Sequence, residues 1–156
     1  LSILMRVMTL LIMKILTKVI VSIIFFAVQT LASAQAEVAV IVSLENNNTY
    51  TSIDKDLVAR IFLGKVSKFP DGTQVKPVNL QQGNYLREAF NRDFLSKTES
   101  QLSRYWSRMR FSGKAALPKE VASTEEMKLV VANDPNLMGY IDSMDVDDSI
   151  KVIHKY

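Results

Sequence analysis

The amino-acid sequence predicts an α/β domain built on a mixed or parallel sheet. Two observations support this fold class. Apolar, β-branched runs alternate with helical patterns that are apolar on one face, and glycines and prolines stand between these segments. All five glycines and all four prolines lie after residue 36. The chain before that point has a different composition.

Residues 1–36 have the pattern of a secretory signal peptide. Lys14 and Lys18 precede the apolar run 19–28, and alanines at alternate positions end at Ala36, after which we expect cleavage. The alternative is an uncleaved membrane anchor. A run of about ten apolar residues is short against the roughly 20 that a spanning helix needs, so the signal peptide is favoured.

The first residues indicate an over-extended start. Leu1 is not an ordinary initiator, and Met5 or Met13 fits better. Residues 37–156 are then expected to form one exported domain in the periplasm. A chain of that length buries about 65% of its unfolded surface, which is enough for one core.

The charge balance changes once the leader is set aside. The whole chain carries 19 Lys and Arg against 16 Asp and Glu, but three basic residues and no acidic ones lie in residues 1–36. The domain is therefore expected to be near neutral, which argues against a nucleic-acid partner. The chain has no cysteine, which excludes disulfides, thiolate metal ligands and a cysteine nucleophile.

The first half of the domain is expected to hold two strands and two helices. The β-branched run 37–43 indicates a buried strand. Ser52 is expected to cap a helix that ends at Gly64. A second strand is expected at 75–80, followed by a helix at about 85–96.

The second half is expected to begin with two helices and to close with two strands. Capping boxes at 98–101 (TESQ) and 123–126 (STEE) mark the helix starts, and Gly113 marks the end of the first. Short apolar runs at 137–141 and 150–154 are expected to be the closing strands.

The domain shows no catalytic constellation, so we expect no enzyme, cofactor or metal. The one histidine, His154, lies in a terminal strand pattern and is expected to be structural or exposed. The acidic stretch 142–148 lacks the glycine and the distal glutamate of a calcium loop and is expected to be a solvated turn. The arginines of 104–110 are expected to lie on a solvated helix face.

The turn between the second strand and its helix is the candidate ligand site. Gln82 and Gly83 follow the carboxyl end of the strand, and the helix is expected to begin at Asn84 and Tyr85. Backbone N–H groups and the helix dipole favour an anion at such a corner, and ligands of open α/β sheets collect at strand ends. The alternative is that Asn84 only caps its own helix.

Several motifs occur in an order that is similar to a known family. They are IFLGK at 61–65, FPDG at 69–72, the strand 75–80 with its glycine turn, Trp106, and MGYI at 138–141. With these motifs, Ser52–Ile141 resembles the phosphate ABC-transporter substrate-binding proteins. The resemblance implies a two-lobed periplasmic clamshell with phosphate in its cleft. This chain is too short for two lobes, so we expect a single mixed-sheet lobe of a type 2 periplasmic binding protein.

The binding loop departs from the family's pattern. The resemblance implies Arg-Ser-Asp-Gly-Ser-Gly-Thr, whereas the chain has Leu-Gln-Gln-Gly-Asn-Tyr at 80–85, without the arginine, the aspartate or the hydroxyls. Gly83 is retained, Asn84 stands at the cap, and Arg87 replaces only part of the lost charge. The ligand residues expected from geometry and resemblance together are Gln82, Gly83, Asn84, Tyr85 and Arg87.

The resemblance implies an exported, non-catalytic solute-binding protein for phosphate or another small anion, with an inner-membrane ABC transporter as a partner. The alternative is an interaction module without a ligand, which docks on a membrane sensor or transporter. A single lobe leaves its cleft face open, and a second copy could cover it, so a homodimer is a further expectation.

Overall fold

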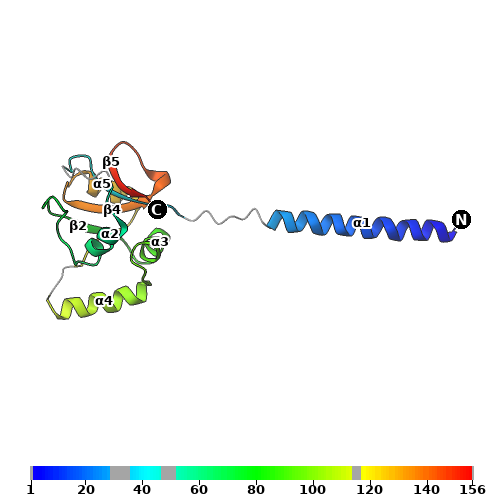
Figure 1. The fold of residues 1–156 in the computed structure, drawn as a ribbon, viewed down its shortest axis with the longest axis horizontal. Helices are drawn as coiled ribbons and strands as arrows, with labels where there is room; N and C mark the ends of the chain where they lie inside the picture. Colours follow the sequence, from blue (N-terminus) through cyan, green and yellow to red (C-terminus); the bar gives the residue numbers. More distant parts are fainter. Residues whose placement is uncertain (1, 29–35, 47–51, 114–116, 156) are drawn as a thin grey trace. The chain divides into compact units, whose positions relative to one another are not determined.

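The computed structural model describes residues 2–28, 36–46, 52–113 and 117–155, which belong to two compact units, 1–35 and 36–156. In the first unit, Ser2–Val28 forms helix α1 (Figure 1). Within the described residues, no helix combines the length and the apolar character needed to cross a bilayer. The alanines at 32 and 34 lie outside these residues, and the signal peptide stays a prediction.

The second unit is built on a five-stranded mixed sheet in the order β3-β2-β4-β1-β5. Strand β2 runs parallel to β3 and β4, whereas β1 runs antiparallel to β4 and β5. The strands are β1 (Val38–Ser43), β2 (Lys76–Leu80), β3 (Lys119–Val121), β4 (Leu137–Asp142) and β5 (Ile150–Lys155). The expected α/β lobe with a mixed sheet is confirmed.

Helices cover both faces of this sheet. They are α2 (Lys55–Phe62), α3 (Tyr85–Asp93), α4 (Glu99–Phe111) and α5 (Thr124–Ala132), and a 3₁₀ turn, η1 (Ser143–Asp145), follows β4. The rings of Phe62 in α2 and Phe90 in α3 contact Tyr140 of β4. A Cβ atom at Gly139 would instead meet side chains of α5. Because adjacent strand residues face opposite ways, α5 lies on the other face from α2 and α3.

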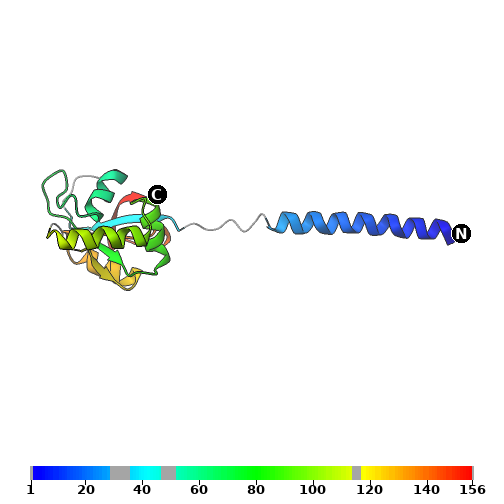
Figure 2. The same ribbon diagram turned by 90° about the horizontal axis from the view of Figure 1, so that it is seen from below.

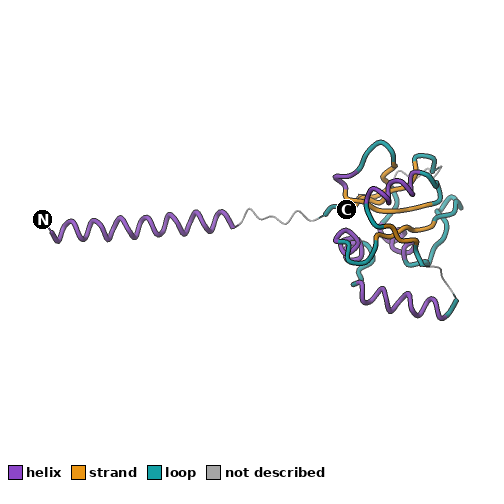
Figure 3. Tube along the Cα trace, turned by 180° about the vertical axis from the view of Figure 1, so that it is seen from behind, coloured by secondary structure: helices purple, strands orange, loops and turns teal. Residues whose placement is uncertain are grey.

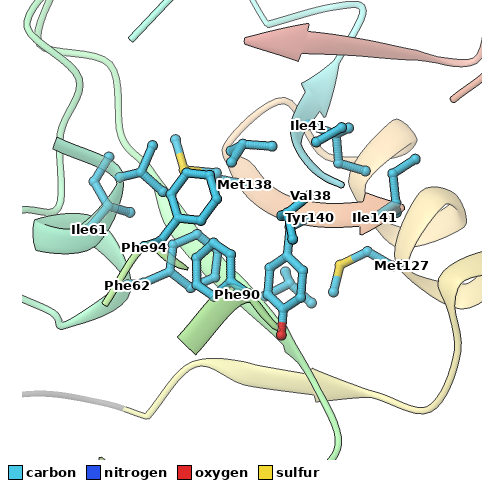
Figure 4. Close-up of a cluster of buried hydrophobic side chains, with 14 of the residues drawn as sticks. Val38, Ile41, Ile61, Phe62, Phe90, Phe94, Met127, Met138, Tyr140 and Ile141 are labelled. Carbon is cyan, nitrogen blue, oxygen red and sulfur yellow. The ribbon is translucent and has the colours of Figure 1, made fainter. Parts of the chain in front are cut away.

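The core is aromatic on the α2–α3 face of the sheet. Phe90 stacks on Tyr140 with ring centroids 4.1 Å apart and lies 4.5 Å from the ring of Phe62 (Figure 4). Every residue of β1 is buried, as expected for a strand between two others. Helix α4 lies beside this body and contributes mainly Leu102 and Trp106 to the core (Figures 1 and 2).

Some expected element boundaries are confirmed and others are wrong. Gly64 and Gly113 follow their helices with positive φ, and the capping box at Thr98 is complete. The cap of α2 is Asp54, not Ser52, because the Asp54 carboxylate accepts the N–H of Leu57 at 2.7 Å. Helix α3 ends at Asp93, three residues before the expected Ser96. Ser96 itself has a φ of 50°, which is incompatible with a right-handed helix.

Candidate functional site

The candidate site is the corner where β2 ends at Leu80 and α3 begins at Tyr85 (Figure 3). The N–H of Asn84 donates to the carbonyl of Gln81 at 3.3 Å, which closes a turn. Gly83 lies in this turn with φ at +84°, a conformation that a side chain disfavours. The sequence therefore places a glycine where the chain must reverse direction before the helix.

Asn84 caps α3, as the sequence predicts. Its Oδ1 accepts the N–H of Leu86 at 2.9 Å, while its own backbone stays extended. With the N–H of Asn84 bonded to Gln81, two of the four N–H groups that a helix start leaves open are satisfied, so two first-turn donors remain at this corner. The side chains of Gln82 and Tyr85 are exposed beside them.

Arg87 lies under the corner and is held by two glutamates. Its side chain is only 6% exposed. Nε donates to Oε2 of Glu99 at 3.0 Å and Nη2 to Oε1 at 2.6 Å, a two-pronged pair of the kind that planar guanidinium groups favour. Nη1 donates to Oε1 of Glu120 at 2.6 Å and to the Leu80 carbonyl at 2.5 Å. The guanidinium thus joins α3 to β2, β3 and α4.

The environment of Arg87 keeps it charged. Burial lowers the pKa of the guanidinium, but the hydrogen bonds and charges of Glu120 and Glu99 outweigh burial and raise this pKa above its ordinary value. Arg87 forms ion pairs with two carboxylates, so the three side chains together carry a net charge of about −1. In this arrangement Arg87 adds no net positive charge at the corner.

Glu99 is the centre of the polar cluster. Besides the two bonds from Arg87, it accepts Nε2 of Gln82 at 3.0 Å and Nδ2 of Asn91 at 2.8 Å. Asn91 is 1% exposed, and its Oδ1 has no donor among the described residues. Glu99 is also the first residue of α4, where a negative charge suits the helix dipole.

A surface pocket of about 590 Å³ adjoins this cluster. Glu99 and Asn91 form part of its wall, and the basic side chains of Arg92 and Lys97 also line it. A second pocket, of about 640 Å³, lies elsewhere, between the loop after α2 and the start of β3, with Trp106 in its wall. The first pocket gives the Arg87 cluster an open side.

The structure brings Gln82 and Arg87 into one cluster through Glu99, and it places Gly83 and Asn84 in the turn above. Tyr85 is 65% exposed. Glu99, Asn91 and Glu120 were not among the site residues expected from the sequence. Arg87 and Asn91 are four residues apart on one helix, and this spacing indicates that their side chains share a face. Nothing in the sequence indicated which carboxylates would bind them.

The remaining candidates have structural roles. Nδ1 of His154 lies 2.7 Å from the Ile53 carbonyl, and its ring meets Phe94 edge-on. Asp142 caps η1, and Asp147 accepts the N–H of Ser149 at 3.0 Å and the ammonium of Lys128 at 2.8 Å. No group of three potential metal ligands occurs among the described residues.

Comparison with known proteins defines the fold. No family model and no curated protein sequence matches the chain. Among solved structures, an ABC-type phosphate transport receptor from Vibrio cholerae superposes with a TM-score of 0.59 at 19% identity, over 77% of this chain and 47% of that one. The fold matches that of one lobe of such periplasmic-binding-protein structures.

Two further structures agree. A putative phosphate ABC transporter substrate-binding protein with bound phosphate, from Clostridium perfringens, gives a TM-score of 0.58 at 18% identity, over 76% and 45% of the two chains. PstS from Borrelia burgdorferi gives 0.56 at 16% identity, over 76% and 47%. The chain therefore spans less than half the length of these structures, and at such identities the likeness concerns the fold.

Proposed function

We propose that the chain is an exported, non-catalytic solute-binding protein that takes a small anion, such as phosphate, at the β2–α3 corner. The observation that carries the proposal is an open helix start at a strand end, in a lobe that shares its fold with a phosphate transport receptor. In this proposal the periplasm is the location, and an inner-membrane ABC transporter is the partner that receives the solute.

In this proposal, the backbone N–H groups of Gly83 and Tyr85 supply the donors, because those of Asn84 and Leu86 are already bonded within the corner. The absence of a side chain at Gly83 lets an anion approach the backbone closely, and a Cβ built there would meet nothing within 4 Å. Gln82 and Arg87 add side-chain donors only if they leave Glu99, which holds both in this structure. Binding by the backbone alone is expected to be weaker than binding with the guanidinium.

Calorimetric titration of the domain with phosphate tests this function. We expect a saturable heat that decreases in Gly83→Val, because a β-branched residue strains the turn and crowds the approach. Gly72→Val is the matched control, since Gly72 also has a positive φ and open space around it but lies in another turn. No heat at millimolar phosphate would remove phosphate as the ligand.

A second function, docking on a membrane sensor or transporter without a ligand, is favoured by the outer face of α4. Arg104 and Arg108 are exposed one turn apart, Phe111 is 95% exposed one turn further, and no ion pair of the described residues includes either arginine. A cationic face with an exposed aromatic side chain suits an acidic partner surface.

Retention of the protein by membranes tests docking. The double variant Arg104→Ser/Arg108→Ser is expected to lose retention, whereas Lys65→Ser, an exposed charge outside α4, is expected to keep it. Equal retention of all three proteins would contradict the role of α4.

Sedimentation tests the homodimer, and a strictly monomeric domain at high concentration would exclude it.

A further inference from the structure

The Glu99 carboxylate is bound in this structure as a small ligand would be. Both of its oxygens accept bonds from the Arg87 guanidinium, at 2.6 and 3.0 Å. Amide groups of Gln82 and Asn91 complete a ring of donors around it. Four donors on one carboxylate, two of them from a cation that is 6% exposed, form a carboxylate-binding site.

The donors come from one part of the chain and the carboxylate from another. Gln82, Arg87 and Asn91 belong to the β2–α3 corner and to α3, where Arg87 and Asn91 are one turn apart. Glu99 belongs to the start of α4. The backbone that carries the donors is therefore separate from the one that carries Glu99, and Glu120 and the Leu80 carbonyl hold Nη1 of Arg87 independently of Glu99.

Glu99 can leave the site without movement of the helix that carries it. The start of α4 is fixed by Thr98 and Gln101, through bonds of 2.9 and 3.3 Å that do not involve the Glu99 side chain. The Glu99 side chain is 30% exposed and borders the pocket of about 590 Å³, into which it can rotate. Lys97 on the pocket wall would attract the displaced carboxylate, as would Arg92, which is paired with Asp93 in this structure.

We propose that Gln82, Arg87 and Asn91 form an oxyanion site, shaped for a carboxylate, that Glu99 occupies as an internal ligand and that an external small carboxylate takes when Glu99 rotates out. The inference rests on the proposed function in one respect, since it uses the same corner and gives its ligand a chemical class. Glu99 then sets the affinity of the site, because any external anion must compete with a carboxylate that is always present.

Chemical rescue tests this site. We expect Glu99→Ala to lower the melting temperature of the chain, and formate or acetate to restore part of the loss in a saturable manner. The same salts should have a much smaller effect on wild type and Glu88→Ala, because Glu99 competes for the site in both proteins. Glu88 is an exposed glutamate of α3 that lines the same pocket and has no bond to Arg87 in this structure. The double variant Arg87→Met/Glu99→Ala should lose the rescue. Phosphate in a parallel titration shows whether the site prefers a carboxylate.

Two results would overturn the proposal: a formate effect of equal size in all four proteins, or none in Glu99→Ala. If Glu99→Ala does not fold even with formate, Glu99→Ser also vacates the site but keeps a polar residue at the start of the helix, and absence of formate binding to it by calorimetry overturns the proposal instead. Phosphate binding by wild type without rescue of Glu99→Ala would leave the proposed function standing and this site rejected. Rescue of Glu99→Ala without phosphate binding by wild type would support this site and reject phosphate as the ligand of the proposed function.

Discussion

At the residue scale, Arg87 decides how the corner behaves. An arginine on the first turn of a helix at a strand end could face a solute, but here its donors are directed inward to Glu99, Glu120 and the Leu80 carbonyl. A buried guanidinium is tolerated only when its charge and its N–H groups are satisfied, and two glutamates meet that condition. The same residue therefore contributes to stability in this structure and places a positive charge beside the corner proposed for the anion.

Arg87→Met is expected to lower the free energy of unfolding by about 2 kcal/mol, because it leaves two neighbouring carboxylates without their cation. This is below the roughly 3–5 kcal/mol seen when a fully buried pair is broken, since Glu99 and Glu120 are 30% and 46% exposed. Urea unfolding of wild type and Arg87→Met measures this loss in the free energy of unfolding. Arg92→Met is the control: Arg92 is 58% exposed, and its loss should cost less than about 1 kcal/mol. Equal losses for the two variants would contradict the role of the cluster.

Asp147 is expected to titrate well below the usual range of an aspartate. The hydrogen bond from Lys128 is the main cause of its lowered pKa, and bonds from Ser149 add to it. Because the pKa falls on folding, the carboxylate stabilises the fold above its unfolded pKa, near pH 4, and this contribution is lost as pH falls through the folded pKa. Carbon NMR of the carboxyl group should show the pKa rising in Lys128→Met and not in Lys119→Met. An unchanged titration in Lys128→Met would contradict this assignment.

At the element scale, the sequence predicted the elements that carry a local signal. Four of the five strands and the four helices of the domain were expected, because apolar periodicity and caps such as Thr98 lie within a few residues of the element they mark. Strand β3 was not expected, since a segment of three residues with one buried side chain, Val121, has no period to recognise. It is a strand because it pairs with β2.

The contact between β4 and α5 depends on the absence of a side chain at Gly139. A Cβ atom there would lie 2.5 Å from Sδ of Met127 and 3.0 Å from Cγ2 of Val131. Gly139→Ala is therefore expected to cost about 1–3 kcal/mol of stability, as overpacking of a core does. Urea unfolding of the single variant measures this cost.

A double-mutant cycle separates this overlap from other effects of alanine. In the Met127→Ala background the main overlap is gone, so the added cost of Gly139→Ala should fall and the two effects should not be additive. Leu129→Ala, on the exposed side of α5, is the matched background in which the cost should stay unchanged. Additive costs with Met127→Ala would show that the overlap is relieved in another way.

At the scale of the whole molecule, the candidate site was only half predictable. The turn, Gly83 and the cap at Asn84 are local, and the sequence placed them correctly. The partners of Arg87 come from 12 and 33 residues further along the chain, and their meeting depends on how α4 and β3 return to the corner. Composition and spacing carry no information on where α4 and β3 pack in the fold, so Glu99 was recognised as the partner of Arg87 only in the structure.

The domain is expected to fold without residues 1–36, because the described core lies within 36–156, where the contacts form a compact unit of their own. Glu37–Tyr156 should unfold in one cooperative transition, with a midpoint in urea equal to that of the whole chain. The control is a fragment that begins at Leu44. It lacks β1, a strand between β4 and β5 whose residues are all buried, and should not fold. If the longer fragment were also unfolded, the N-terminal unit would have to contribute to stability, and its removal as a leader would be incompatible with a folded exported domain.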